Sequence, residues 1–149
     1  MSLFALSDTH LSLSTDKPMD IFGSRWQQHD KRISEAWTET VGDGDTVVIA
    51  GDISWAMSMD DALTDLAYLD RLPGRKLIGR GNHDYWWGTV NKMKKFFVEQ
   101  HGLSTLDFLY NNAFEVGEFI VCGSRGWWGD EGLCPSGVDY GKIVAREAL

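Results

Sequence analysis

The stretch KLIGRGNHDYWWG, residues 76–88, joins a short apolar run to a polar turn and three consecutive aromatic residues. The run KLI predicts a short strand. The glycines mark positions where a backbone turns sharply or another group approaches closely, and Asn and Asp favour turns because their side chains can hydrogen-bond nearby backbone. Taken alone, the stretch fits a glycine-rich turn with an aromatic core patch as well as it fits a functional site.

The residues before this stretch predict two further strands and two helices. The apolar runs LFAL, residues 3–6, and TVVIA, residues 46–50, are typical of strands buried in a sheet. Apolar residues recur at helical spacing over residues 33–41 and 59–67, and Ser58 with Asp61 has the pattern of a capping box. Alternating strands and helices predict an α/β fold with parallel strands and right-handed crossovers.

The residues after the stretch predict a helix, two strands and a last helix. Thr89 can cap a helix that ends at Gly102. The runs FLYN, residues 108–111, and EFIVCG, residues 118–123, predict a pair of antiparallel strands. A final helical stretch is expected near residues 143–149.

The composition is that of a globular domain. The 149 residues are 43% hydrophobic and 24% charged, which excludes a disordered chain and suffices for one core. The net charge of -8 disfavours nucleic-acid backbones and anionic membranes as partners, and it suits a bound cation. The start MSLFALSD has no basic segment and no apolar run reaches membrane-spanning length, so neither a signal peptide nor a membrane partner is expected. A cytoplasmic location is predicted.

The two cysteines, Cys122 and Cys134, are too few for a disulfide framework, and their spacing matches no zinc pattern. Within FIVCG, Cys122 has the setting of a buried strand residue. A reducing compartment fits this usage.

Polar residues follow each of the three predicted parallel strands, in SDTH, AGDIS and GRGNHD. Sites in open parallel sheets form outside the carboxyl ends of the strands, so these residues should meet at one edge. In an extended chain, residues two apart point the same way, which would direct Asp8 and His10 at a shared target. Any one of these residues alone is more often a turn, cap or surface residue. Together they predict a site formed by Asp8, His10, Asp52, Asn82, His83 and Asp84.

The charges of this site predict a bound metal ion. Each close pair of carboxylates repels by about 4 kcal/mol at an effective dielectric near 20, and a cation relieves that repulsion. Mixed oxygen and imidazole ligands suit a divalent transition metal better than calcium. Asp52, on the middle strand, could bridge two ions, and two ions about 3.5 to 4 Å apart would clamp the attacking and leaving oxygens of a displacement. Because a metal lowers the pKa of bound water from about 15.7 towards 7, the pattern predicts hydrolysis.

The blocks DTH at residues 8–10, GD at 51–52 and GNHD at 81–84 resemble, in this order, the calcineurin-like metallophosphoesterases. The longer stretches DKPMDIFGSRW, GDISWAM, GNHDYWW and CGSRGW resemble an uncharacterised bacterial subgroup of them. The resemblance implies a four-layer αββα sandwich, in which two mixed sheets pack face to face with helices outside. It also implies hydrolysis of phosphate mono- or diesters by a metal-bound hydroxide at a two-metal site.

The resemblance further implies a role for each site residue. His83 would stabilise the phosphoryl oxygens or protonate the leaving group, and Asp84 would orient His83. The two divalent ions would be Mn, Fe, Zn or Ni, and the substrate a small phosphoester, with a nucleotide among the candidates. Asp8 and His10 would bind the first ion, Asp52 would bridge, and Asn82 would bind the second.

The chain departs from the family pattern in its phosphate contacts. Trp55 stands where many relatives carry Arg or another polar residue, so Arg80 and Arg125 are the candidate phosphate contacts. The aromatic residues 85–87 are expected to pack the segment down and wall the cleft, with a stacking role as the alternative.

The graver departure is that the family's later histidine motifs, a lone His and GHxH, do not follow Asp84. The two remaining histidines, His29 and His101, do not lie in a sequence context that matches either motif. Residues 1–149 therefore resemble the N-terminal portion of a single metallophosphoesterase domain. Two interpretations remain: a phosphoesterase completed by a C-terminal half or another subunit, and a non-catalytic metal-binding or interaction remnant. Half a sandwich leaves a sheet face without its partner, so self-association or a completing half is expected.

Overall fold

Four short strands form one parallel sheet in the order β1-β2-β3-β4. The computed structural model describes residues 1–125 and 130–147. One row across the sheet pairs Ala5 with Val48, Val48 with Leu77, and Leu77 with Asp107. The alternation of strands and helices predicted from the sequence is confirmed. The strands are β1 (Leu3–Leu6), β2 (Thr46–Ile49), β3 (Arg75–Gly79) and β4 (Leu106–Leu109).

Helices connect these strands and bury their apolar residues against one face of the sheet. The side chains of Ser58 and Thr89 accept hydrogen bonds from backbone N–H groups three residues later, so both predicted N-caps are confirmed. The helices are α1 (His29–Thr40), α2 (Met59–Asp70), α3 (Val90–Met93), which continues as the π-helical segment η3 (Lys94–Gln100), and α4 (Tyr140–Glu147). Short 3-10 helices are η1 (Met19–Phe22), η2 (Ser24–Trp26) and η4 (Glu131–Leu133).

The core lies between the sheet and the helices α2 and η3. Ile49, Ile78 and Phe108 of the strands are fully buried there, together with Leu66 of α2 and Phe97 of η3. Helix α1 stands over β1 with a cavity of about 770 Å³ beneath it. The helices therefore cover β2, β3 and β4 closely. Strand β1 is less covered, and its residues are exposed or half-buried.

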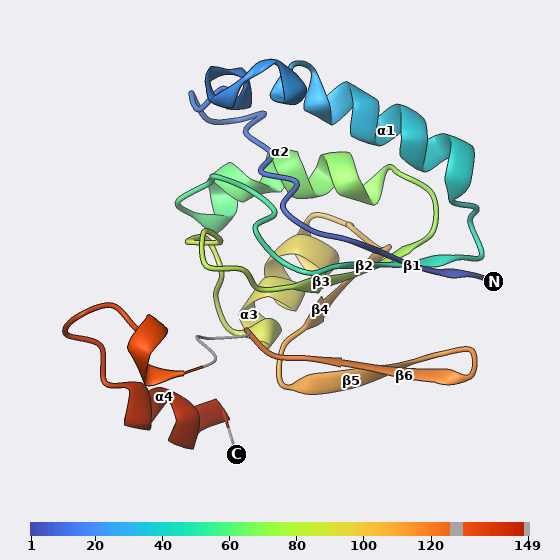
Figure 1. Cartoon of the computed structure of the whole chain (residues 1–149). Coiled ribbons are helices and arrows are strands. Elements are labelled where there is room, and N and C mark those ends of the chain that lie inside the picture. The colour runs from blue at the N-terminus through green and yellow to red at the C-terminus, as the bar shows by residue number, and fades with distance from the viewer. Residues whose placement is uncertain (126–129, 148–149) are drawn as a thin grey trace.

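An antiparallel hairpin, β5 (Asn112–Val116) and β6 (Phe119–Gly123), lies on the other side of the sheet from α1 and α2 (Figure 1). The predicted pairing of residues 108–111 with 118–123 is wrong. Leu106, Phe108 and Leu109 are at most 3% exposed, so this run joins the buried parallel sheet beside β3. Asn111, at a φ of 51°, then reverses the chain into the hairpin.

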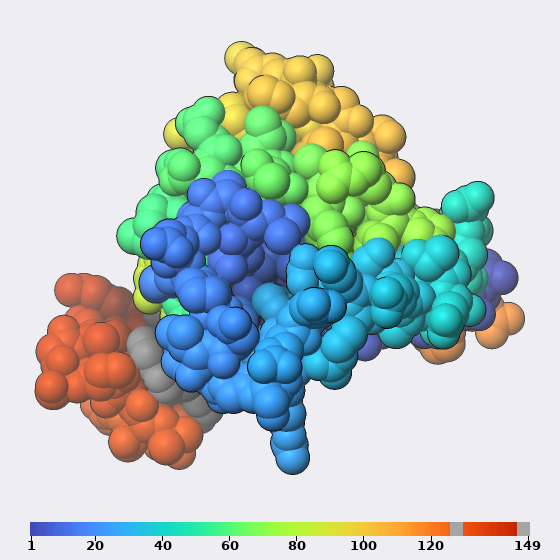
Figure 2. All heavy atoms as spheres, turned by 90° about the horizontal axis from the view of Figure 1, so that it is seen from above, coloured from blue at the N-terminus to red at the C-terminus, as the bar shows by residue number. Residues whose placement is uncertain are grey.

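The outer face of the hairpin is uncovered. Ile120, on the same face of β6 as Cys122, is 65% exposed. Phe119 pairs with Val116 on the opposite face; Val116 is buried, whereas Phe119 is 61% exposed. Cys122 is exposed, which corrects the expectation of a buried strand residue, because it lies on the outer face of β6. Seen from above, residues 130–147 stand to one side of the main body (Figure 2). None of the helices within the described residues is long and apolar enough to cross a membrane.

Candidate metal centre

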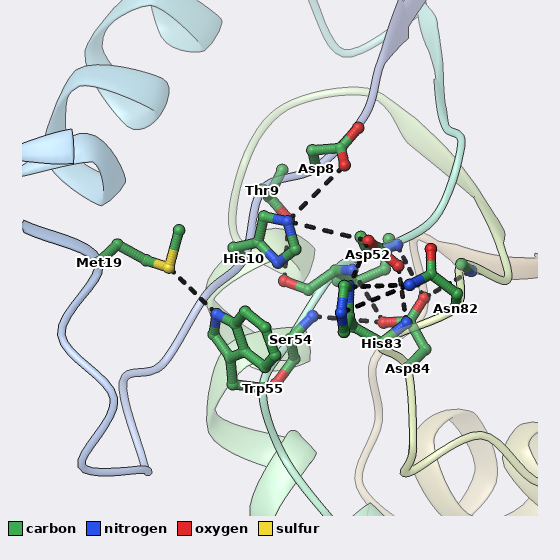
Figure 3. A network of polar contacts seen from close by, with 12 residues as sticks. Asp8, Thr9, His10, Met19, Asp52, Ser54, Trp55, Asn82, His83 and Asp84 are labelled. Atoms are coloured by element: carbon green, nitrogen blue, oxygen red, sulfur yellow. Dashed lines mark hydrogen bonds and ion pairs between the residues drawn. The ribbon is translucent and has the colours of Figure 1, made fainter. Parts of the chain in front are cut away.

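The segments that follow β1 and β2 remain paired beyond the sheet and carry the site. The amide of Asp8 donates to Gly51 O at 3.1 Å and that of His10 to Asp52 O at 3.0 Å. Leu11 then donates to Ile53 O at 2.8 Å. This pairing brings the DTH and GD blocks to one edge, as the rule for parallel sheets predicts (Figure 3).

The backbone at the predicted ligands is left-handed. Asp8, His10 and Asp52 have φ values of 57°, 42° and 52°, a region that residues other than glycine rarely adopt. The expectation that Asp8 and His10 converge because the chain is extended is therefore wrong. They still converge, with His10 Nε2 3.7 Å from Asp8 Oδ1, because the backbone pairing imposes these conformations. Such strain is characteristic of functional sites.

Two glycines permit the close approach of the second and third loops. A Cβ on Gly51 would collide with the backbone N of Gly81, and a Cβ on Gly81 would collide with the Asp52 carboxylate. Gly79 and Gly81 do not have positive φ values, so a left-handed backbone is not what requires glycine at these two positions. The glycine before Asn82 is needed because Asp52 lies against it.

The Asp52 carboxylate is the centre of the cluster and is 7% exposed. Its Oδ1 accepts from the backbone N of His83 at 2.9 Å; its Oδ2 lies 2.8 Å from His83 Nδ1 and 3.8 Å from His10 Nε2. Burial opposes ionisation, but these hydrogen bonds with His83 and the two nearby imidazoles hold the pKa of Asp52 below its usual value. His10, Asp52 and His83 each offer one ligand atom, all within 4.8 Å of one another.

The donor chemistry of this cluster fits a divalent transition metal. Burial lowers the pKa of His10 despite the neighbouring Asp52 and Asp8, which favours the neutral imidazole that binds metals. A neutral imidazole nitrogen beside carboxylate oxygens is a donor set that such ions accept. The other ring nitrogen, His10 Nδ1, is buried and has no hydrogen-bond partner within residues 1–125 and 130–147.

His83 contacts the Asp52 carboxylate directly, whereas Asn82 contacts the ring of His83. The amide nitrogen of Asn82 contacts the His83 ring, at 3.1 Å from Nδ1 and 3.4 Å from Nε2. His83, for which the resemblance implies a catalytic role, lies among the predicted ligands. Both residues are near the surface, where a substrate can approach them.

Asp84 lies beneath the site and is 1% exposed. Burial raises its pKa, although the amides bonded to it oppose this. Its hydrogen bonds come from both loops and not from the His83 ring, so it fixes the backbone around His83 rather than the imidazole directly. The donors are the backbone N–H groups of Gly81, Asp52, Ile53 and Ser54 and the indole N–H of Trp86.

The two predicted phosphate contacts are half-buried. Arg80 directly follows β3, and its buried Nε has no hydrogen-bond partner in the described part of the chain. Arg125 follows β6. Contact of either guanidinium with a phosphate stays a prediction.

Several functional neighbours of the site were not predicted. Asp65 of α2 is fully buried and accepts hydrogen bonds from Ser54 Oγ at 2.5 Å and from Leu13 N at 2.9 Å, which ties the first loop to the second. Trp26 and Trp55 both contact the His10 ring. An isolated buried Asp or Trp has no spacing signal in the sequence, so these contacts depend on tertiary structure.

Of the three consecutive aromatic residues 85–87, two lie in the core and one lies at the surface beside the site. Trp86 and Trp87 are 3% and 8% exposed and pack in the core, as the sequence predicts. Tyr85 is 53% exposed and lies edge-on to His83 at 6.2 Å between ring centroids. Tyr85 is thus the member of the triplet that a substrate could reach.

Comparison with known proteins matches the chain to one family. A family model described as calcineurin-like phosphoesterase matches residues 1–145. The Gene 66 protein of Mycobacterium phage L5 is 41% identical over 58 residues, which cover 39% of this chain and 28% of that protein. The Gene 66 protein of Mycobacterium phage D29 is 45% identical over 56 residues, covering 38% of this chain and 28% of that protein.

One solved structure has a similar fold. The crystal structure of AQ665, a protein of unknown function from Aquifex aeolicus, matches with a TM-score of 0.55 at 18% identity. The match covers 98% of this chain and 72% of that one. At this identity the likeness concerns the fold alone.

Proposed function

The chain belongs to the calcineurin-like phosphoesterase family, and from this premise we propose that it carries the first part of a metal-dependent phosphoester hydrolase site. The observation that carries the proposal is the convergence of His10, Asp52 and His83, with Asp8 beside them, at the ends of the parallel strands. The chain spans 28% of the length of the curated relatives it matches. The activity of a whole protein is therefore part of the proposal.

Asp8, His10 and Asp52 would hold one divalent ion, and Asp52 with Asn82 would hold a second. The identity of the ions is Mn, Fe, Zn or Ni. When bound, such ions activate water at neutral pH and polarise a phosphoryl oxygen. Among the described residues, Asp52 is the carboxylate that approaches both histidines, which supports its role as the shared ligand.

His83 and its neighbours would act on a small phosphate monoester or diester. His83 lies at the surface of the cluster, so it can donate a proton to the leaving-group oxygen or a hydrogen bond to a phosphoryl oxygen. Asp84 would keep the loop that carries His83 in place. Arg80 and Arg125 would neutralise phosphate charge, since guanidinium groups pair well with phosphate.

The first test is metal binding. We expect the protein to bind Mn²⁺ in titration calorimetry, and Asp52→Ala to weaken binding more than roughly 100-fold, because loss of a ligand should exceed the 10- to 100-fold loss seen for groups behind the ligands. Glu115→Ala, which removes an exposed carboxylate on β5, is the matched control. Binding that Asp52→Ala leaves untouched would contradict the proposed site.

The second test separates a catalytic from a ligating His83. With p-nitrophenyl phosphate and its bis ester as substrates, His83→Asn should lower kcat about 10² to 10⁴-fold with metal content unchanged. An equal loss of metal would make His83 a ligand. Metal binding without turnover of either ester would favour the non-catalytic interpretation of this chain.

A further inference from the structure

The indole of Trp55 lies against both imidazoles of the candidate metal centre. Its ring is stacked on His10, with centroids 5.0 Å apart and an interplanar angle of 19°. It is tilted against His83, with centroids 4.8 Å apart (Figure 3). The two imidazoles are 5.7 Å apart, so one side chain contacts both rings that flank Asp52.

His10 lacks the contact that usually orients a metal-binding histidine. Such a residue normally donates its second ring N–H to a carboxylate, carbonyl or water, which fixes the ring plane and the tautomer. Here Nδ1 of His10 is buried and has no hydrogen-bond partner among the residues that the structure describes. The contacts that hold the ring are aromatic: Trp55 on its face and Trp26, at 6.0 Å and 66°, on its edge.

Trp55 is itself held by groups on separate segments. Its indole N–H donates to Met19 Sδ at 3.1 Å, and the ammonium of Lys17 lies over its ring, 4.2 Å from the centroid. Its backbone N–H donates to Leu11 O at 2.9 Å. The ring is therefore fixed from the segment before α1 as well as from its own loop, and the residue is partly buried.

We infer that Trp55 is a positioning residue of the metal centre. Its ring sets the plane of His10, and through the second contact that of His83, so that His10 Nε2 points at Asp52 Oδ2. Packing against an indole takes the place of the hydrogen bond that elsewhere orients such a histidine. The inference deepens the proposed function and, as regards metal affinity, rests on it.

The first measurement needs no metal. Carbon relaxation of the His10 ring, assigned with His10→Asn, reports how firmly the imidazole is held on the ps–ns timescale. We expect a rigid ring in the metal-free wild type and in Trp55→Phe, and a mobile ring in Trp55→Ala. Phe119→Ala, which removes an exposed aromatic on β6, is the control for losing a ring elsewhere and should leave His10 rigid.

The second measurement is Mn²⁺ affinity by calorimetry on the same variants. Trp55→Ala should bind roughly 10- to 100-fold more weakly, the range for removing a group that orients a ligand. Trp55→Phe should stay within about threefold of the wild type, because a phenyl ring can still stack. If Trp55→Ala does not fold, Trp55→Leu serves instead, since it keeps apolar bulk without a ring.

The outcomes separate the two proposals. A rigid His10 and unchanged affinity in Trp55→Ala would overturn the positioning role, as would equal loss of affinity in Trp55→Phe and Trp55→Ala. A lower melting temperature with a rigid His10 would mean that Trp55 is only a packing residue. If the wild type binds no Mn²⁺, the proposed function fails, and the mobility of the His10 ring alone decides the role of Trp55.

Discussion

At the scale of single residues, the site depends on buried carboxylates that bind backbone rather than metal. Asp84 and Asp65 are at most 1% exposed, and both accept backbone N–H groups from the loops that carry the predicted ligands. Their chemistry resembles that of the ligand carboxylates, so the sequence alone does not separate the two roles. The two roles are separated by the three-dimensional arrangement of hydrogen-bond donors around each carboxylate.

Replacing Asp84 should therefore affect stability and metal binding together. We expect Asp84→Asn to lower the free energy of unfolding by about 2 to 3 kcal/mol, because the new amide NH₂ faces buried N–H donors that lose their acceptor. Mn²⁺ affinity should fall as well, since both loops shift. Guanidinium denaturation and calorimetry measure the two effects, with exposed Asp43→Asn as the control. An Asp84→Asn protein as stable as that control would contradict this account.

At the scale of elements, the end of α2 is held to β3 by a buried lysine. Lys76 is fully buried, and its ammonium donates to Leu72 O at 2.5 Å, Gly74 O at 2.8 Å and Asp70 O at 3.3 Å. Asp70 is the last residue of α2, and Leu72 and Gly74 lie in the turn between α2 and β3, so the ammonium joins the helix end, the turn and the strand. Burial lowers the pKa of Lys76 to about 8 from 10.5, although Asp70 opposes this.

This lysine predicts a pH dependence of stability. Between pH 8 and 10.5 the unfolded chain binds the proton more tightly than the folded protein, so the contribution of Lys76 to stability rises with pH over that window and is constant below it. The free energy of unfolding of the wild type relative to Lys76→Met should increase by up to about 3 kcal/mol. Urea denaturation from pH 7.5 to 10.5 tests this, with exposed Lys142→Met as a flat reference. If the free energy of unfolding of the wild type relative to Lys76→Met fell with pH, the three carbonyls would stabilise the charged ammonium more than burial destabilises it.

The strands and helices also show how much of the fold and of the site can be predicted from the sequence. Strands β1 to β3 and their helices follow from apolar runs and helical spacing, and the site follows because parallel strands end at one edge. The predicted strand FLYN, residues 108–111, overlaps β4 only in part, and so short a run does not distinguish a parallel partner of β3 from an antiparallel partner of β6. The left-handed φ values of Asp8, His10 and Asp52 depend on pairing between two loops, which no local pattern encodes. The stacking of Trp55 on His10 likewise depends on Lys17 and Met19.

At the scale of the whole molecule, apolar surface remains uncovered in two places. The hairpin covers part of the sheet, where Leu77 and Leu109 are at most 3% exposed, but β1 stays open beside Leu3 and Ala5. Strand β6 carries exposed Phe119 and Ile120, on opposite faces, and pairs with no strand besides β5 among the described residues. A free strand edge with such residues favours association with another chain.

We therefore propose that these 149 residues associate through β6, either with a second copy or with a completing segment. Sedimentation should give a mass above 16.8 kDa that depends on concentration. Ile120→Lys should reduce association with a change in stability within about 0.5 kcal/mol, as is usual for exposed positions. The matched control is Val144→Lys on α4, which is exposed away from the hairpin. A clean 16.8 kDa monomer with a sharp thermal transition would contradict this proposal.

The pairing of the loops after β1 and β2 has a consequence for ligand capture. Because Asp8, His10 and Leu11 donate into the backbone of residues 51–53, the floor of the site is hydrogen-bonded as one ribbon with the sheet. An incoming ion or phosphate would find these groups already arranged, so little chain entropy remains to be lost on binding. Opening the floor would require breaking the β1–β2 ribbon itself. Amide exchange at Leu11 should therefore be nearly as slow as at Ile49 in the centre of the sheet, with or without a ligand.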